Sequence, residues 1–290
     1  MSNDPTEWGL PPARTGTEAA EDLVQRRAMV REYVRPEPEA GTTCTDRDWA
    51  GTPSMVVEVP GANGTIVYFH GGGFRLGHPR MWAGFASRLA LAAGMDVVVP
   101  DYGLAPEDPY PNALRQAAAA YEAALAGGGP VVVGGDSAGG GLAASLAVAC
   151  IAARVTMPVA ALLISPWVDM RVTASTYDSR AGTDTLFSRD AALEASAGYL
   201  QGAAADDPLV SPLLADLAGF PPAMVLAGGD EVLLEDSLDL ARRLALAGSS
   251  VELHVAAGEQ HVWPSTEPAT PLALAATARM GEFLRRCAGG

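Results

Sequence analysis

The stretch from Val131 to Gly140 restricts the fold of this chain more than any other. Three β-branched residues run into two glycines, a serine follows, and small residues then lead into an alanine-rich segment. This order predicts a strand, a very sharp turn and a helix, with Ser137 at the turn and a glycine two positions away on each side. The G-x-S-x-G pattern of Gly135, Ser137 and Gly139 also fits an ordinary glycine-rich turn. The strand before it and the helix after it are what favour an exposed nucleophile.

Strand-like and helix-like segments alternate along most of the chain. Such alternation predicts a mostly parallel sheet with helices on both faces. Asn63-Gly64 is a hairpin signal between the first two strand-like runs, so we expect the sheet to open with antiparallel strands. The expected strands cover residues 55–59, 65–69, 96–99, 130–133, 159–164, 223–227 and 251–255, and the expected helices cover 17–34, 82–93, 112–126, 142–154, 189–200, 234–247 and 271–286.

The alternation stops between Ser165 and about Phe220, where no strong strand is found. A break of this length inside an α/β domain is usually functional, such as a lid or cap. Its aromatic residues either line a pocket or hold the cap together, and both interpretations stay open. The expected helix at residues 17–34 has an apolar face interrupted by Arg27, lacks a partner nearby in sequence, and could pack against this segment.

Reactive residues are expected just after strands, because ligands of parallel sheets bind beyond the carboxyl ends. Ser137, the glycine run after His70, Asp230 and His261 all satisfy this condition. The order Ser, Asp, His is the order of an α/β-hydrolase triad. His261 would take the proton of Ser137, and Asp230 would hold the imidazole tautomer. The glycines at 71–73 would let backbone N–H groups face an oxyanion, although a flexible turn also explains them.

The other histidines fit the role of general base less well. His254 alternates with apolar neighbours inside an expected strand, so it faces a sheet surface and is interpreted as structural. His78 lies in a loop before a proline, with no strand end beside it. His70 is expected to support the glycine loop that follows it.

Two other acids compete with Asp230. Glu231 is its neighbour but lies one residue further from the strand, so Asp230 is favoured and Glu231 is the alternative. Asp136 precedes the serine directly and cannot easily orient a histidine that also reaches Ser137.

Composition narrows the class of partner. The chain has 34 acidic and 19 basic residues and a formal charge of −15, which disfavours nucleic acid and anionic membrane surfaces. Its three cysteines are widely spaced, which argues against a disulfide framework or a metal site. The first residues lack a basic start followed by an apolar run, and no membrane span is found, so a cytoplasmic location is expected. The sequence leaves open whether two copies form a homodimer.

Four motifs together resemble one family. They are His-Gly-Gly-Gly at 70–73, Asp-Tyr-Gly-Leu-Ala-Pro-Glu at 101–107, Gly-Asp-Ser-Ala-Gly-Gly at 135–140 and Ser-Pro-Trp at 165–167. Over roughly residues 63–286 the chain resembles the hormone-sensitive-lipase family of α/β-hydrolases, whose bacterial members are carboxylesterases. The resemblance implies an eight-stranded sheet and a helical cap, with residues 1–45 and 166–205 as cap and residues 46–165 and 206–290 as core. It also implies a Ser137–Asp230–His261 triad and an oxyanion hole from the backbone of Gly72, Gly73 and Ala138.

Several positions depart from the commonest pattern of that family. They are Gly103 for arginine, Asp108 for histidine, Gly141 for asparagine, Glu231 for proline and Val262 for glycine. None of these changes removes a triad member, but they put the pocket shape, and so the substrate, in doubt.

The sequence therefore predicts a serine carboxylesterase for short- to medium-chain esters, which works through an acyl-enzyme without a metal or organic cofactor. Phe74, Asp136 and Trp167 are expected to line the substrate pocket. A deacetylase or lactone hydrolase acting on a natural product would use the same residues. A ligand-binding member of the fold without activity is a third reading, which the presence of both Ser137 and His261 disfavours.

Overall fold

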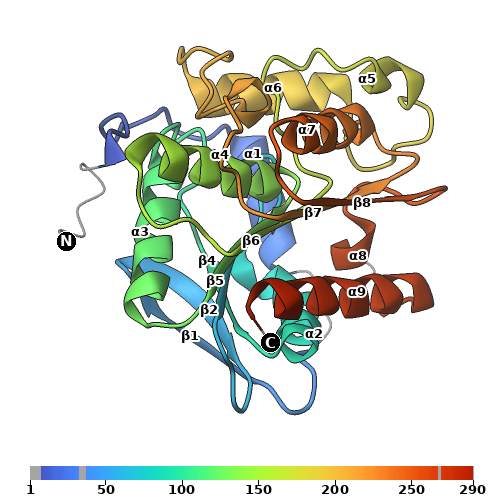
Figure 1. The fold of residues 1–290 in the computed structure, drawn as a ribbon. Helices are drawn as coiled ribbons and strands as arrows, with labels where there is room; N and C mark the ends of the chain where they lie inside the picture. Colours follow the sequence, from blue (N-terminus) through green and yellow to red (C-terminus); the bar gives the residue numbers. More distant parts are fainter. Residues whose placement is uncertain (1–7, 33–36, 267–268, 290) are drawn as a thin grey trace.

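A twisted eight-stranded sheet forms the centre of the computed structural model, which describes residues 8–32, 37–266 and 269–289 (Figure 1). The strands lie in the order β1-β2-β4-β3-β5-β6-β7-β8. The pairs β1/β2 and β2/β4 are antiparallel, and all other neighbours are parallel. The strands are β1 (Thr43–Trp49), β2 (Thr52–Glu58), β3 (Thr65–Phe69), β4 (Asp96–Pro100), β5 (Val131–Asp136), β6 (Ala160–Ile164), β7 (Ala223–Gly228) and β8 (Val251–Ala256).

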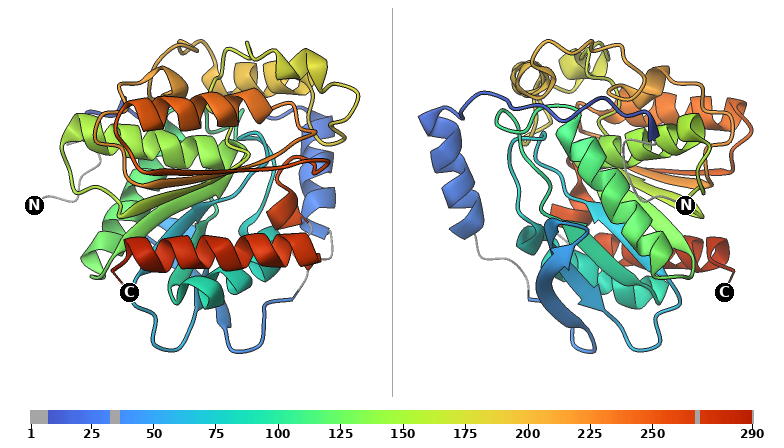
Figure 2. Two further views of the ribbon diagram at one scale, coloured as in Figure 1. Left: turned by 45° about the vertical axis from the view of Figure 1, so that its right-hand side comes forward. Right: turned by 90° about the vertical axis from the view of Figure 1, so that its left-hand side faces the viewer.

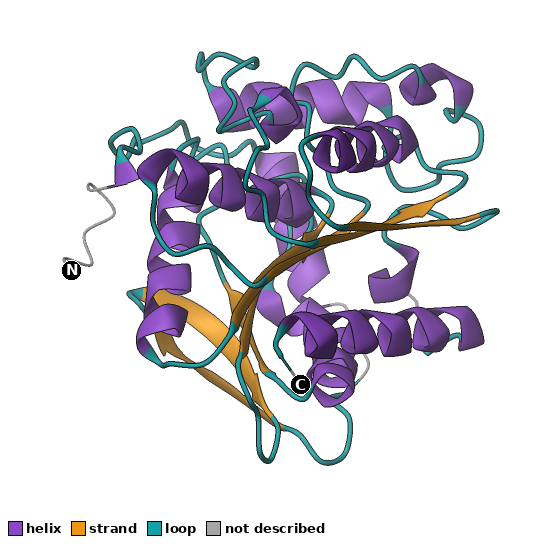
Figure 3. Ribbon diagram, in the orientation of Figure 1, coloured by secondary structure: helices purple, strands orange, loops and turns teal. Residues whose placement is uncertain are grey.

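Helices cover both faces of this sheet, as Figure 3 shows by the purple layers around the orange strands. One face packs against α3 (Asn112–Ala126), α4 (Ala138–Ala153) and α7 (Leu234–Leu246), and the other packs against α2 (Ala83–Ala93) and α9 (Pro271–Cys287). The two apolar cores follow the alternation of strand side chains. In β3, Val67 and Phe69 belong to one core, while Ile66 and Tyr68 belong to the other. The predicted α/β architecture is therefore confirmed.

The remaining helices lie outside these two layers. In Figure 1, α5 (Thr176–Ser179) and α6 (Arg189–Leu200) lie at the top, on the far side of α4 and α7 from the sheet. Figure 2 shows α1 (Glu21–Glu32) at the side of the molecule, apart from both layers. The remaining helices are short: η2 (Pro79–Trp82), η3 (Pro212–Leu214) and α8 (Trp263–Thr266). Within the described part of the chain, no helix is both long and apolar enough to cross a membrane.

The α1 helix is held by a charged residue. Arg27 pairs with Glu107 at 2.6 Å, and its guanidinium also donates to the carbonyls of Arg75 and Ala105. Leu23 is the buried residue of this helix. The residue that interrupts the apolar face is thus the one that anchors α1 beside the loop after β3. The helix begins at Glu21 rather than at Thr17, and the predicted end at Val34 lies outside the described residues.

Most element bounds agree closely with the sequence prediction, but the opening of the sheet does not. The antiparallel hairpin joins β1 to β2 through Ala50 and Gly51, whose φ angles of 55° and 81° suit a two-residue turn. The predicted hairpin at Asn63-Gly64 is wrong, because β4 lies between β2 and β3 in the sheet. Since β1 begins at Thr43, the predicted boundary at residue 45 falls inside this strand. The division into cap and core stays a prediction.

Candidate active site

Ser137 lies at the sharp turn between β5 and α4. Its φ of 55° and ψ of −123° place it in strained backbone for a residue with a side chain. A Cβ added to Gly139 would overlap the carbonyl oxygen of Phe69, and one added to Gly135 would overlap the backbone of Gly139. These two glycines are therefore required by the turn, and Ser137 is held at the N-terminus of α4.

The imidazole of His261 lies between this serine and a buried carboxylate. Its Nε2 is 2.8 Å from Ser137 Oγ, and its Nδ1 is 3.2 Å from Oε2 of Glu231. With the proton on Nδ1, His261 donates to the carboxylate and accepts from the serine hydroxyl. The three groups come from the loops after β5, β7 and β8; β7 and β8 are neighbours in the sheet, and β6 alone separates them from β5. This geometry allows a proton to pass from the hydroxyl to the imidazole.

The carboxylate beside His261 belongs to Glu231, so the prediction of Asp230 for this position is wrong. Glu231 is fully buried, whereas Asp230 is half-buried and its backbone N–H donates to the carbonyl of Glu259. Gly229 and Asp230 form the turn directly after β7, and Glu231 follows them. The second residue of the acidic pair, with its longer side chain, is therefore the one that reaches it.

Charges around the imidazole favour its protonated form. Burial acts to lower the pKa of His261, but the hydrogen bond and negative charge of Glu231 outweigh it, with smaller contributions from Asp184 and Asp136, so the pKa is raised. Burial also raises the pKa of Asp136 to about 7, against the hydrogen bond that its Oδ1 accepts from the Tyr68 hydroxyl. The site therefore stabilises an imidazolium close to Ser137.

The loop after β3 is braced by stacked rings. His70 lies between the rings of Trp82 and Tyr102, at centroid distances of 5.1 and 4.4 Å. Its Nδ1–H donates to the carbonyl of Gly71, and the Tyr102 hydroxyl donates to the carbonyl of His70. Burial lowers the pKa of His70 to about 4, so the ring is neutral at pH 7. His70 thus supports the glycine loop, in the role expected from the sequence.

Glycine is required at the centre of this loop. Gly72 and Gly73 have φ angles of 120° and 62°, and a Cβ on Gly72 would overlap the carbonyl oxygen of Leu76. Both glycines line the same cavity as Ser137. Ala138 is the first residue of α4, so its N–H is among those left without a partner in the helix. These are the three groups predicted to form an oxyanion hole.

A cavity of about 360 Å³ opens over Ser137 and His261. Its walls come from the glycine loop, from η2, from α1 and from the region of α6. Its larger apolar side chains include those of Val30, Met81, Trp82, Leu186 and Phe187.

Of the three residues predicted to line this cavity, only Asp136 does. Phe74 is 2% exposed and stacks on Tyr199 at 3.8 Å, and Trp167 is fully buried. Both rings are therefore part of the core behind the cavity. Trp167 packs against a residue of the cavity wall, since its ring lies 5.5 Å from that of Phe187, which does line the cavity. In the sequence, Phe187 is one of several aromatic residues in the break between Ser165 and Phe220, and no local pattern distinguishes it from the others.

Residues 183–187, here called the 183–187 segment, contact the turn that carries Glu231. The hydroxyl of Thr183 donates to the carbonyl of Asp230 at 2.9 Å. Oδ2 of Asp184 accepts the N–H of Val232 at 2.8 Å. The residues on both sides of Glu231 are therefore held by this segment.

The same segment also contacts the turn that carries His261. The backbone N–H and the hydroxyl of Thr185 both lie 3.0 Å from Oε1 of Gln260. The ring of Phe187 stacks on the imidazole of His261 at 5.8 Å with an angle of 15° between the planes. The 183–187 segment, which lies between β6 and β7, thus contacts both the turn that carries Glu231 and the turn that carries His261.

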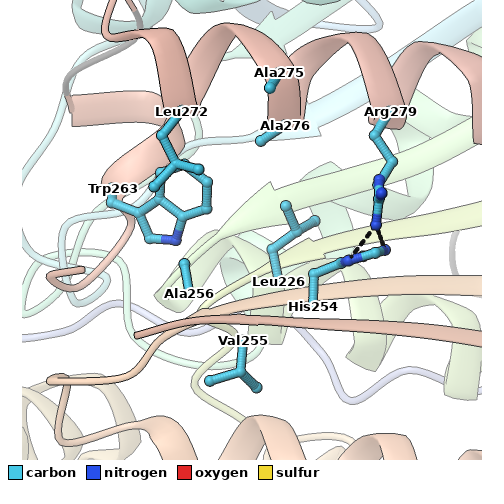
Figure 4. Close-up of a pocket in the computed structure, with 9 residues that line it drawn as sticks. All are labelled: Leu226, His254, Val255, Ala256, Trp263, Leu272, Ala275, Ala276 and Arg279. Carbon is cyan, nitrogen blue, oxygen red and sulfur yellow. Dashed lines mark hydrogen bonds between the residues drawn. The ribbon is translucent and has the colours of Figure 1, made fainter. Parts of the chain in front are cut away.

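The remaining histidines lie away from Ser137. His254 lies in a separate hollow of about 330 Å³ between β8 and α9, where the guanidinium of Arg279 lies 2.8 Å from its Nδ1 (Figure 4). The residues that line this hollow include no hydroxyl or thiol side chain. His78 accepts the N–H of Arg80 and lies 4.0 Å from Asp101. Neither histidine is placed to activate a nucleophile.

Comparison with known proteins gives consistent findings. The family model described as alpha/beta hydrolase fold matches residues 66–265. An acetyl-hydrolase of Streptomyces hygroscopicus is 35% identical over 229 residues, which cover 78% of this chain and 76% of the relative. An esterase of Acinetobacter venetianus is 32% identical over 222 residues, which cover 75% and 73%. The crystal structure of an esterase from the bacterial hormone-sensitive lipase family matches with a TM-score of 0.84 and 33% identity, covering 94% of this chain and 100% of that one.

Proposed function

Because the chain belongs to the hormone-sensitive-lipase family of α/β-hydrolases and hydrolyses carboxylic esters, we propose that Ser137, His261 and Glu231 are its catalytic triad. The observation that carries this assignment is the continuous hydrogen-bonded chain from Ser137 Oγ through the imidazole to Glu231, at 2.8 and 3.2 Å. This arrangement has the geometry that activates a serine nucleophile.

In the first half of the reaction, Ser137 Oγ attacks the ester carbonyl while His261 Nε2 takes the hydroxyl proton. Glu231 stabilises the imidazolium that forms and keeps the proton on Nδ1. The ester C–O bond then breaks, and the imidazolium returns its proton to the departing alcohol. The product of this half is an ester between the acyl group and Ser137.

In the second half, water attacks the acyl-enzyme. His261 takes a proton from the water, the bond between the acyl carbon and Ser137 breaks, and the proton returns to Ser137 Oγ. The carboxylic acid then leaves. In both halves the backbone N–H groups of Gly72, Gly73 and Ala138 would stabilise the negative oxygen of the tetrahedral intermediate.

The preferred substrate is a short- to medium-chain ester. The cavity of about 360 Å³ is at the small end of the range for ligand sites, and its apolar wall suits an acyl chain. A second candidate is deacetylation of a specific natural product, favoured because one relative is named an acetyl-hydrolase. The cytoplasmic location and the homodimer stay predictions from the sequence.

The triad is tested with Ser137→Ala and p-nitrophenyl esters of acyl chains from acetate upward. Loss of the nucleophile should reduce kcat by many orders of magnitude. Activity within a few fold of the wild type would refute the assignment. A fluorophosphonate probe should label the wild type and not the variant, whereas a folded wild type that is not labelled would favour a ligand-binding protein.

The chain-length series and a panel of acetylated natural products separate the two candidate substrates. A gradual decline of kcat/KM with acyl length fits a general esterase. High kcat/KM for one acetylated compound, with weak activity on all simple esters, fits the deacetylase. Preference for long acyl chains would contradict both.

A further inference from the structure

A buried serine at the end of β6 adopts a conformation that is unfavourable for it. Ser165 follows Ile164 directly, is fully buried, and has a φ of 46°. Left-handed backbone is uncommon for a residue with a side chain, and such strain persists where the surroundings enforce it, often at functional sites. In the sequence this residue belongs to the Ser-Pro-Trp motif, to which no role was assigned.

The hydroxyl of Ser165 connects the loops that carry the acid and the base. It donates to Oε2 of Glu231 at 2.6 Å, and it accepts the N–H of Val262 at 3.1 Å. Val262 follows His261 directly in the chain. A single hydroxyl therefore links the carboxylate to the backbone beside the imidazole, with both of its hydrogen-bonding functions in use.

Glu231 depends on this contact more than an aspartate would. A glutamate side chain has one more rotatable bond, so more of its conformations point away from the imidazole. Oε2 accepts from both Ser165 and His261, while Oε1 is buried and has no hydrogen-bond partner among the described residues. The position of the carboxylate is thus fixed by Ser165 and His261 together.

We propose that Ser165 is a positioning residue of the catalytic site, which holds the Glu231 carboxylate against Nδ1 of His261. This inference rests on the proposed triad. Without the hydroxyl, the carboxylate would sample other conformations, and fewer molecules would hold the imidazole in the reactive tautomer and orientation. Ser165 is fully buried and is not among the residues that line the cavity, so we do not expect it to contact the substrate. The loss should therefore fall on kcat rather than on KM.

The test compares two substitutions of Ser165 with a control. Ser165→Ala removes the hydroxyl and keeps the strained backbone, whereas Ser165→Gly removes the hydroxyl and relieves the strain. Ser145→Ala is the control, since this serine is buried within α4 and, among the described residues, forms no side-chain hydrogen bond with a triad residue. For both Ser165 variants we expect a decrease of roughly 10- to 100-fold in kcat with KM changed less than about twofold. The control should keep both constants, and thermal unfolding should show that the glycine variant is folded.

The same substitutions in a Glu231→Ala background separate positioning from a general structural role. If Ser165 acts through Glu231, Ser165→Gly should reduce kcat less than about threefold once the carboxylate is gone. An equal reduction in both backgrounds would overturn the proposal. The proposal would also be overturned if both Ser165 variants kept the kcat of the wild type while Glu231→Ala lost activity. That result would leave the proposed triad unaffected. Failure of the triad itself has a different signature, which is activity retained in Ser137→Ala.

Discussion

Replacing Glu231 with glutamine tests the acid that the geometry selects. The substitution keeps the size of the side chain but removes the charge that faces the imidazolium in the transition state. At a separation of 3.2 Å and an effective dielectric constant of about 20, the attraction is about 5 kcal/mol. This corresponds to a decrease in kcat of between about three and four orders of magnitude, similar to the roughly ten-thousand-fold effect of the equivalent substitution in a serine protease triad.

The assay is steady-state hydrolysis of a short p-nitrophenyl ester between about pH 5 and about pH 9, which brackets histidine titration. Asp230→Asn is the matched control, because it removes the neighbouring carboxylate that does not contact His261, and it should keep kcat within about threefold. Since Glu231 raises the pKa of His261, the acid limb of kcat/KM should move to lower pH in Glu231→Gln. A larger loss in Asp230→Asn than in Glu231→Gln would refute the assignment.

Three further predictions concern residues around the triad. In the folded protein the pKa of Asp136 is about 7, against 3.8 for the ordinary group, so the free energy of unfolding falls as the pH rises between these values. The asparagine of Asp136→Asn does not ionise. The free energy of unfolding of this variant, measured with urea, should therefore rise relative to that of the wild type by up to about 4 kcal/mol between about pH 3 and about pH 8. Phe74→Ala should lower the free energy of unfolding by about 3–5 kcal/mol without altering acyl preference, whereas Leu186→Ala should alter acyl preference with little effect on stability; the reverse pattern would place Phe74 in the pocket. Asp184→Asn should lose at least one of three hydrogen bonds to backbone N–H groups, with a decrease of about tenfold in kcat, and an unchanged kcat would show that the 183–187 segment does not position the triad.

The sequence predicted those parts of the site that depend on where strands end. Ser137 directly follows the buried strand β5, and His261 lies in the loop after β8. Parallel strands bring their carboxyl ends to one edge, so the meeting of these two residues could be inferred without coordinates. The bounds of β3, α3 and α6 were also predicted to the residue. Local pattern and topology were sufficient for these elements.

The acid could not be chosen in this way. Asp230 and Glu231 are adjacent, and which of them faces His261 depends on how the turn after β7 bends and how far each side chain reaches. Likewise, the orientation of Phe74 depends on packing against Tyr199, a residue far away in sequence. Such contacts are set by tertiary structure and leave no local periodicity.

The first strand was missed because its composition is polar. Residues 43–49 read Thr-Cys-Thr-Asp-Arg-Asp-Trp and are exposed or half-buried along their length, as an edge strand can be. Without β1 in view, the turn at Asn63-Gly64 was the remaining hairpin signal. The error in pairing followed from that omission.

The contacts of the 183–187 segment have a consequence for altering this protein by exchange of parts. A transplant of the region between β6 and β7, made to admit bulkier esters, would also remove the groups that fasten Asp230, Val232 and Gln260. A chimera that keeps Thr183, Asp184 and Thr185 while changing Leu186 and Phe187 would separate selectivity from turnover. We expect a chimera that lacks Thr183, Asp184 and Thr185 to hydrolyse new substrates only with a lower kcat.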